Sequence, residues 1–194
     1  MAYVERLLGV HGFADMTPQA LLAIGAAPYA AGVCLALFGV YAILQASPSS
    51  IGLRLPKVAG LALGVVGGVA TSLIVTFLVR ELRLQSSYNL QYEHYILSHA
   101  TGLIAAALFL VFLVFGPIVE EIVFRGIVME GLINVTNGVV VVSAGIFAGI
   151  HAAGGVAQIT GAFTVGLVLG WLYLRTRSIV TNSVAHSIYN AAAF

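Results

Sequence analysis

Charged residues are scarce in this chain of 194 residues: they make up 8% of the sequence, against 60% hydrophobic residues. A soluble domain carries roughly a quarter charged residues, and a disordered chain needs high charge and low hydrophobicity, so both classes are excluded. The single cysteine, Cys34, excludes a disulfide framework and a cysteine-based metal site. The net charge of +1 without a basic cluster gives no support to a nucleic-acid partner. What remains is a polytopic membrane protein.

Long apolar runs are what the chain does contain. A helix needs about 20 apolar residues to cross the hydrocarbon core. No charged residue occurs between positions 18 and 53, and the further apolar runs cover 58–79, 100–119, 139–150, 156–174 and 179–194. The segment 118–133 carries charges in an apolar context, and Gly116-Pro117 leaves open whether it continues the preceding helix. We predict an all-α transmembrane bundle of about six to eight helices, forming one domain over residues 1–194.

The two ends of the chain differ in character. Residues 1–17 are partly charged and lack a separate cleavable apolar core, so we expect an interfacial segment here and no signal peptide. Residues 100–194 carry the polar motifs described below. On a count of about seven helices, the arginines at 80–83 and 175–177 share the side of the N-terminus, opposite those at 54–57, and the positive-inside rule places the N-terminus in the cytoplasm.

Several glycines recur at four-residue spacing. They are Gly60, Gly64 and Gly68; Gly145 and Gly149; and Gly166 and Gly170. Such spacing lets helix backbones approach closely in lipid. Apolar helices are also rich in glycine by composition alone, so the sequence leaves each of these contacts open.

The informative residues are polar ones within the apolar segments of the C-terminal half: Glu120, Glu121, Arg125, His151, His186 and Asn190. Ionisable groups at membrane depth cost roughly 2.5–3.5 kcal/mol each on insertion scales, so they are rare and usually functional. Glu121 and Arg125 are spaced to pair on one helix face, an arrangement that more often serves packing than catalysis. A single intramembrane histidine or asparagine can likewise serve only a hydrogen bond between helices.

Glu120 points about 100° away from Glu121 on a helix and has no partner nearby in the sequence. If Pro117 begins the helix, Glu120 lies near its first turn, where the helix dipole favours a carboxylate. Desolvation and the neighbouring like charge act in the opposite direction. A carboxylate under such competing influences is a candidate general base.

The set as a whole suits hydrolysis. His186 and Asn190 project from one face of the last helix, and His151 lies at the end of another apolar run. A carboxylate, two imidazoles and an amide from separate helices can activate water and donate hydrogen bonds to an oxyanion. Glu120, His151 and His186 could alternatively bind a zinc ion, with an open position for water. The spacing does not decide between these two arrangements.

Three motifs occur in order: EExxxR at 120–125, FxxxH at 147–151 and HxxxN at 186–190. Together they resemble the CPBP family (CAAX prenyl protease and bacteriocin-processing, or Abi), over residues 102–190. Each motif alone is weak, but three in order at membrane depth are specific. The resemblance implies an intramembrane peptidase, either a metalloprotease or a glutamate-type protease, that acts on prenylated or membrane-embedded peptides.

The same resemblance implies a role for each residue. Glu120 would activate the water, with His151 helping to orient it. His186 and Asn190 would stabilise the oxyanion. Glu121 and Arg125 would hold the helix and support the site. The substrate and any dependence on a divalent metal such as zinc stay open.

Two other functions are compatible with parts of the pattern. A non-catalytic membrane scaffold or bacteriocin-immunity protein would not need the otherwise unpaired Glu120. A proton-coupled transporter could use Glu and His as a relay, but the chain is short and has no evident repeat halves. We therefore expect a multi-pass protein of the cell membrane whose partners are lipid and a lipid-modified or membrane-embedded peptide, with no nucleic acid.

Overall fold

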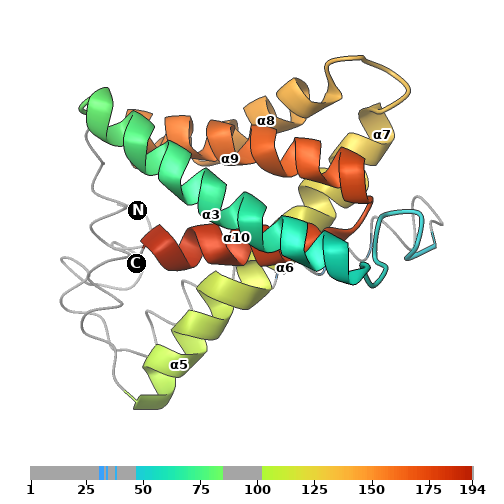
Figure 1. Cartoon of the computed structure of the whole chain (residues 1–194), viewed down its shortest axis with the longest axis horizontal. Helices are drawn as coiled ribbons and strands as arrows, with labels where there is room; N and C mark the ends of the chain where they lie inside the picture. Colours follow the sequence, from blue (N-terminus) through green and yellow to red (C-terminus); the bar gives the residue numbers. More distant parts are fainter. Residues whose placement is uncertain (1–30, 33, 35–37, 39–46, 85–101, 194) are drawn as a thin grey trace.

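The computed structural model describes residues 31, 32, 34, 38, 47–84 and 102–193, and all regular structure among them is helical (Figure 1). The N-terminal segment 1–17, most of the first apolar run and the whole connection 85–101 lie outside the described residues. Apart from one long composite helix, the elements are α3 (Val58–Glu81), α8 (Val139–Ile150), the 3-10 turn η5 (Ala152–Gly154), α9 (Gly155–Thr176) and α10 (Ile179–Ala193).

The two predicted segments 100–119 and 118–133 form one continuous helix. Its parts are α5 (Gly102–Leu110), the π-helical η3 (Val111–Phe115), α6 (Gly116–Glu121), the π-helical η4 (Ile122–Met129) and α7 (Glu130–Leu132). Phe115, just before Gly116-Pro117, keeps helical dihedral angles of φ −69° and ψ −44°. The helix therefore does not begin at Pro117. Of the two alternatives that the sequence left open, the continuous helix is the one observed, so Glu120 does not lie in a first helical turn and the helix dipole gives its carboxylate no support.

Three described helices are long and apolar enough to cross a membrane: Val58–Glu81, Ala105–Leu132 and Ala152–Thr176. On α3, the side chains of Val66, Leu73 and Phe77 are more than half exposed, as expected where lipid covers a helix. The all-helical membrane architecture is thus confirmed for the described residues. The count of six to eight helices stays a prediction, because the first apolar run is largely outside them.

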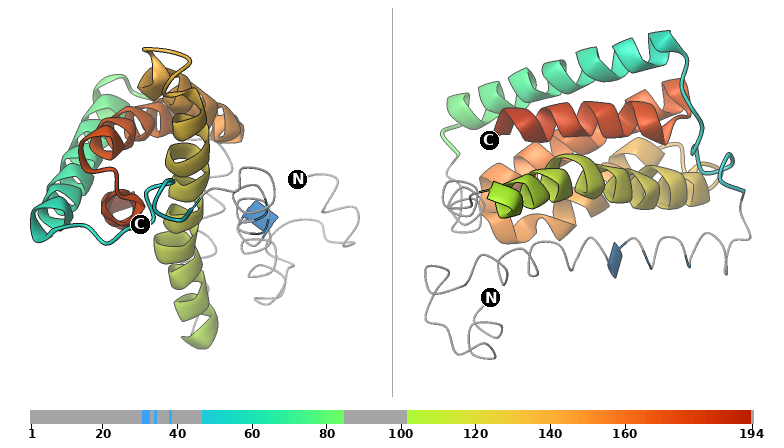
Figure 2. Two further views of the ribbon diagram at one scale, coloured as in Figure 1. Left: turned by 90° about the vertical axis from the view of Figure 1, so that its right-hand side faces the viewer. Right: turned by 90° about the horizontal axis from the view of Figure 1, so that it is seen from below.

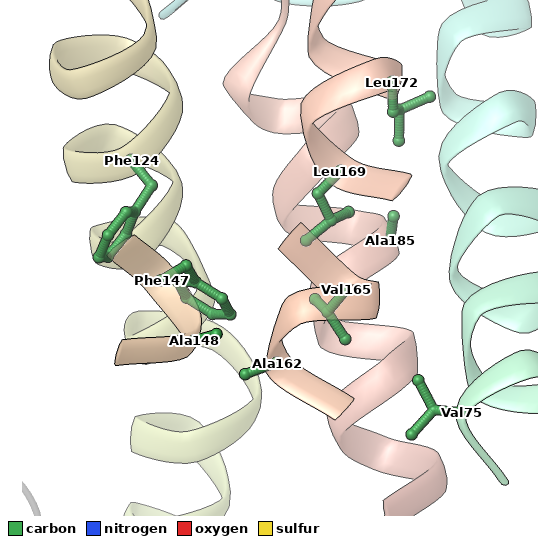
Figure 3. Close-up of a cluster of buried hydrophobic side chains, with 9 residues drawn as sticks. All are labelled: Val75, Phe124, Phe147, Ala148, Ala162, Val165, Leu169, Leu172 and Ala185. Carbon is green, nitrogen blue, oxygen red and sulfur yellow. The ribbon is translucent and has the colours of Figure 1, made fainter. Parts of the chain in front are cut away.

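Helix α10 runs through the middle of the bundle (Figures 1 and 2). It packs against α3, α9 and the composite helix, while α8 packs against the other side of α9. The core between these helices contains Phe124, Phe147, Val165, Leu169 and Ala185, with the two phenylalanine rings edge to face at a centroid separation of 4.9 Å (Figure 3). This packing carries polar groups of the composite helix and α10 into the protein interior.

Two of the three glycine repeats are contact faces, and the third is not. A Cβ on Gly64 would lie 2.7 Å from the carbonyl oxygen of Thr181, and one on Gly68 would lie 2.6 Å from that of Ala185, so α3 and α10 touch through their backbones. Gly166 and Gly170 meet Ala144 and Val140 of α8 in the same way. For Gly145 and Gly149, whose contacts the sequence left open, a Cβ would meet nothing within 4 Å among the described residues.

The loops at 54–57 and 175–178 meet at one end of the bundle. Arg54 Nε donates to the carbonyl oxygen of Arg177 at 2.7 Å, and Ser178 Oγ donates to that of Arg54 at 3.1 Å. Arg80 lies at the opposite end of α3. The predicted grouping of 175–177 with 80–83 is therefore wrong, because the composite helix crosses once where two helices were counted. The distribution of arginines therefore no longer favours a cytoplasmic N-terminus.

Candidate active site

A fully buried ion pair lies at the centre of the bundle. Arg125 Nη1 donates to Glu121 Oε1 at 3.0 Å, and both side chains are 0% exposed. Nη2 of Arg125 donates to the carbonyl oxygen of Gly166 at 3.3 Å. A charge at this depth is tolerated only when it is paired and hydrogen-bonded, so each member depends on the other. The pairing predicted from the spacing of Glu121 and Arg125 is confirmed.

His186 of α10 lies between the two glutamates. Its Nδ1 is 2.9 Å from Glu121 Oε1, and its Nε2 is 3.6 Å from Glu120 Oε2. A carboxylate paired with a buried arginine is ionised and can only accept hydrogen bonds, so Nδ1 is the donor. The Glu120 side chain is 16% exposed, unlike that of Glu121. The ring therefore presents Nε2 toward the more accessible carboxylate. Glu120, Glu121, Arg125 and His186 thus form one polar cluster in the interior of the bundle.

His151 is the C-cap residue of α8 and reaches the cluster through Phe147. Its ring centroid is 4.5 Å from that of Phe147, which in turn lies 5.9 Å from the ring of His186. Nδ1 of His151 is 2.8 Å from the carbonyl oxygen of Phe147. A carbonyl oxygen only accepts, so Nδ1 carries the hydrogen, and Nε2 of the neutral ring is left to accept a hydrogen bond.

Asn190 lies one helical turn beyond His186, and its amide donates to the carbonyl oxygen of Phe112 at 3.0 Å. Phe112 belongs to the π-helical stretch η3, where the hydrogen-bond ladder of the helix is interrupted. The amide therefore joins α10 to the composite helix. Its predicted contact with an oxyanion is not tested by this arrangement.

One buried residue of the cluster was missed in the sequence. Asn182 is 0% exposed, and its Nδ2 donates to Glu121 Oε2 at 3.1 Å and to the carbonyl oxygen of Leu169 at 2.7 Å. A signal for it existed, because Asn182, His186 and Asn190 recur every four residues on one face of α10. Phe147 was noted only as part of a motif, although its ring contacts both histidines and the Arg125 guanidinium.

An apolar groove of about 360 Å³ opens on the adjacent face of α10. It is lined by Leu53, Val114, Ile118, Ile179, Val180, Ser183, Val184, Ser187 and Ile188. The residues of α10 that line it, among them Ser187, alternate along the helix with those that carry the polar cluster. Ser183 is 7% exposed, and its hydroxyl has no hydrogen-bond partner within the described part of the chain.

The zinc alternative for Glu120, His151 and His186 finds no support in the arrangement. Within the described ranges, no group of three His, Cys, Asp or Glu side chains is close enough to hold a metal ion. The residues present do not fit a metal site, and we derive no step through one.

The predicted site residues thus differ in how closely they gather. Glu120, Glu121, Arg125 and His186 form one cluster, His151 adjoins it through Phe147, and Asn190 is joined to Phe112. The geometry is what a buried acid–base site requires. Their individual catalytic roles stay predictions.

Comparison with known proteins agrees with the motifs. Residues 102–192 match a family model described as "Type II CAAX prenyl endopeptidase Rce1-like", and this range contains all three motifs. No curated protein matches the chain. No solved structure matches it either. The family and the three long apolar helices together support an integral membrane protein. The resemblance inferred from the motifs is confirmed at the level of the family model: residues 102–192 match the Rce1-like family of type II CAAX prenyl endopeptidases.

Proposed function

We propose that this protein is an intramembrane endopeptidase that hydrolyses a peptide bond in a prenylated or otherwise membrane-anchored substrate, with Glu120 as the general base. The observation that carries the proposal is the position of His186, whose two ring nitrogens face Glu121 and Glu120 at 2.9 and 3.6 Å. If the ion pair between Glu121 and Arg125 were purely structural, neither Glu120 nor the imidazole of His186 would be needed beside it. The family supplies the substrate class.

The reaction begins with a water molecule beside Glu120. The Glu120 carboxylate takes one proton from this water, and the hydroxide oxygen forms a bond to the carbonyl carbon of the scissile peptide. The carbonyl electrons move to oxygen, giving a tetrahedral oxyanion. Glu120 then returns the proton to the peptide nitrogen as the carbon–nitrogen bond breaks, which releases an amine and a carboxylic acid. A positioned base of this kind typically contributes ~10²–10⁴-fold to the rate.

The surrounding residues orient the water and stabilise the developing charge. The acceptor Nε2 of His151 is suited to holding a hydrogen of the attacking water. His186, once protonated, can donate from Nε2 to the oxyanion while its Nδ1 stays on Glu121. Asn190 is assigned the second oxyanion donor, and loss of one such donor typically costs ~2.7–4 kcal/mol of transition-state stabilisation.

The groove beside His186 is suited to the hydrocarbon chain of the substrate. Its lining is almost entirely aliphatic, and it opens between α10 and the composite helix. A lipid chain lying there would bring an attached peptide next to the polar cluster. Val184→Trp, which fills this groove, is expected to raise KM for a farnesylated peptide and to leave KM for the same peptide without the lipid unchanged.

The central test uses Glu120→Gln in purified protein reconstituted in lipid nanodiscs. The substrate is an internally quenched, farnesylated peptide ending in a CAAX sequence. Glu120→Gln keeps the size of the side chain but removes the base, so turnover should fall at least 100-fold, within the range expected for a positioned base. Glu81→Gln, at the exposed end of α3, is the matched control and should leave turnover unchanged.

Other outcomes separate the alternatives. Full turnover in folded Glu120→Gln protein would refute the role of Glu120 as base. A wild-type protein that cleaves neither prenylated nor transmembrane peptides would favour a scaffold or immunity protein. Proton-driven flux in proteoliposomes, lost in Glu120→Gln, would favour a transporter.

A further inference from the structure

We infer that Asn182 is a positioning residue of the active site: it holds the Glu121 carboxylate in the orientation from which Glu121 fixes the ring of His186. This inference rests on the proposed peptidase function. Asn182 lies outside all three motifs that led to the family. The inference is carried by hydrogen-bond geometry and burial at the junction of α9, α10 and α6.

The amide of Asn182 uses both of its hydrogens on acceptors. Nδ2 donates to Glu121 Oε2 at 3.1 Å and to the Leu169 carbonyl oxygen at 2.7 Å. An amide turned by 180° would put Oδ1 against two acceptors, which would repel it, so the observed orientation is the only favourable one. The side chain is 0% exposed, so water does not compete for these bonds.

The oxygen of the same amide carries a free-energy cost of burial. Oδ1 of Asn182 is buried and has no hydrogen-bond partner in the described part of the protein. An apolar side chain would avoid leaving a buried acceptor unsatisfied. Thr181 and Ser183 of the same helix also have buried hydroxyls without a partner in the described part of the protein. What distinguishes Asn182 from them is its donation to Glu121.

The two oxygens of Glu121 have different tasks. Oε1 accepts from both Arg125 Nη1 and His186 Nδ1, at 3.0 and 2.9 Å. Oε2 accepts from Asn182. The terminal torsion of a glutamate is soft, so a carboxylate held at one oxygen can rotate about it. Asn182 anchors the other oxygen to the backbone of α9, and the plane of the carboxylate is then fixed relative to His186.

Fixing that plane fixes the direction of the His186 ring. The contact from Nδ1 to Glu121 determines where Nε2 points, and Nε2 faces Glu120 at 3.6 Å. Partners that orient a metal-binding histidine through its second nitrogen typically matter by 10–100-fold when they are removed, and we expect an effect of the same order for a histidine that acts without a metal. Asn182 acts one step further out, through Glu121, and touches no reacting atom.

The kinetic test compares Asn182→Leu with Thr181→Val. Leucine has the same number and branching of side-chain heavy atoms as asparagine but cannot donate. Thr181 is the adjacent residue, is 0% exposed, and its hydroxyl has no partner among the described residues, so its valine variant is a control for buried polar loss on α10. We expect kcat to fall about 10–100-fold in Asn182→Leu, with KM for the farnesylated peptide unchanged, and no change in Thr181→Val. An equal loss in both variants would overturn the inference.

A double variant distinguishes positioning from packing. If Asn182 acts through Glu121, adding Asn182→Leu to Glu121→Gln should lower kcat no further, because the carboxylate that it orients is already gone. Independent losses would multiply. Multiplied losses would therefore contradict a role through Glu121. Asn182→Gln, which keeps the amide but moves it by one methylene, serves if Asn182→Leu does not fold, and the same kcat-selective loss is expected.

A spectroscopic readout keeps this inference separate from the proposed function. In ¹⁵N-histidine-labelled protein in nanodiscs, the His186 ring, identified by comparison with His186→Phe, should show one species with Nδ1 protonated and hydrogen-bonded. In folded Asn182→Leu protein it should show a second species or exchange broadening, whether or not any peptide is cleaved. An unchanged His186 spectrum would overturn the positioning role. A changed spectrum in a protein without peptidase activity would uphold it while the peptidase proposal fails.

Discussion

The amide of Asn190 donates to the carbonyl oxygen of Phe112 at 3.0 Å, and the reason lies five residues further along the composite helix. In a regular α-helix this carbonyl would accept from the N–H of Gly116. In η3 that N–H bonds to the carbonyl of Val111 instead, and the next residue, Pro117, has no N–H to give. Asn190 therefore supplies this carbonyl with a donor from another helix.

Replacing Asn190 should consequently affect stability as well as activity. Asn190→Leu leaves the Phe112 carbonyl without this donor inside the membrane, so the free energy of unfolding should fall by about 1–3 kcal/mol. Thermal and detergent unfolding, followed by circular dichroism, measure this loss. Adding Pro117→Ala restores a backbone donor and should recover part of the stability but not the turnover. Undiminished stability in Asn190→Leu would show that this hydrogen bond contributes nothing to the fold.

The Glu121–Arg125 pair should be intolerant of losing one member. Arg125→Met leaves a buried carboxylate without its cation, which typically costs 3–5 kcal/mol. Arg175, exposed on α9 over the ring of Trp171, is the matched control, and Arg175→Met should unfold like the wild type. The double variant Arg125→Met with Glu121→Leu removes both charges and should regain part of the stability, with turnover still lost. Wild-type stability in Arg125→Met would contradict the buried pair.

The contact between α3 and α10 predicts a difference between two glycines. A Cβ at Gly68 would lie 2.6 Å from the Ala185 carbonyl oxygen and 2.8 Å from the Ile188 side chain. Gly68→Ala should therefore cost about 1–3 kcal/mol of unfolding free energy through overpacking. Gly145→Ala meets nothing within 4 Å and should be neutral or stabilising by up to about 1 kcal/mol, because alanine is the better helix former. Equal effects in detergent unfolding would argue against a backbone contact at Gly68.

The regular spacing of residues along a helix explains which features of the site could be predicted from the sequence. The spacing of Glu121 and Arg125 within one helix determines their pairing, so the sequence alone sufficed. The chemistry of isolated charges at membrane depth identified Glu120 and His186 as residues that need partners, and they lie 3.6 Å apart. Such inferences succeed because burying an unpaired charge in lipid is so costly that few arrangements are tolerated.

The failures have a common physical origin in non-local packing. Pro117 usually breaks a helix, but a π-helical turn lets the backbone continue through it, and propensity does not predict that turn. Because one continuous helix replaces the two that were counted, the arginines at 175–177 lie at the end of the bundle opposite to the predicted one. Gly145 and Gly166 have equivalent spacing, yet only Gly166 faces another helix. Asn182 was overlooked because an asparagine carries no charge that demands a partner, and its importance comes from Glu121 on a different helix.

The hydrogen bonds that join α7 to the end of α9, here called the polar latch, give the last prediction. Glu130 accepts hydrogen bonds from the Tyr173 hydroxyl and from Arg177 Nη2, both at 2.8 Å, and so joins α7 to the end of α9. Tyr173 is 0% exposed, and its ring packs against Gly52, whose φ of 82° suits glycine. Tyr173→Phe keeps that packing and removes one hydrogen bond, so unfolding free energy should fall by about 0.5–1.5 kcal/mol.

Turnover of Tyr173→Phe should match the wild type under conditions where both are folded, because the latch shares no residue with the cluster at Glu120 and His186. Gly52→Ala is the sharper variant: its Cβ would lie 2.8 Å from the Tyr173 ring and hydroxyl on a backbone that disfavours alanine. Its unfolding midpoint should therefore drop further than that of Tyr173→Phe. If Tyr173→Phe instead lowered turnover without lowering stability, the latch would be coupled to the reaction and not merely to the joining of α7 and α9.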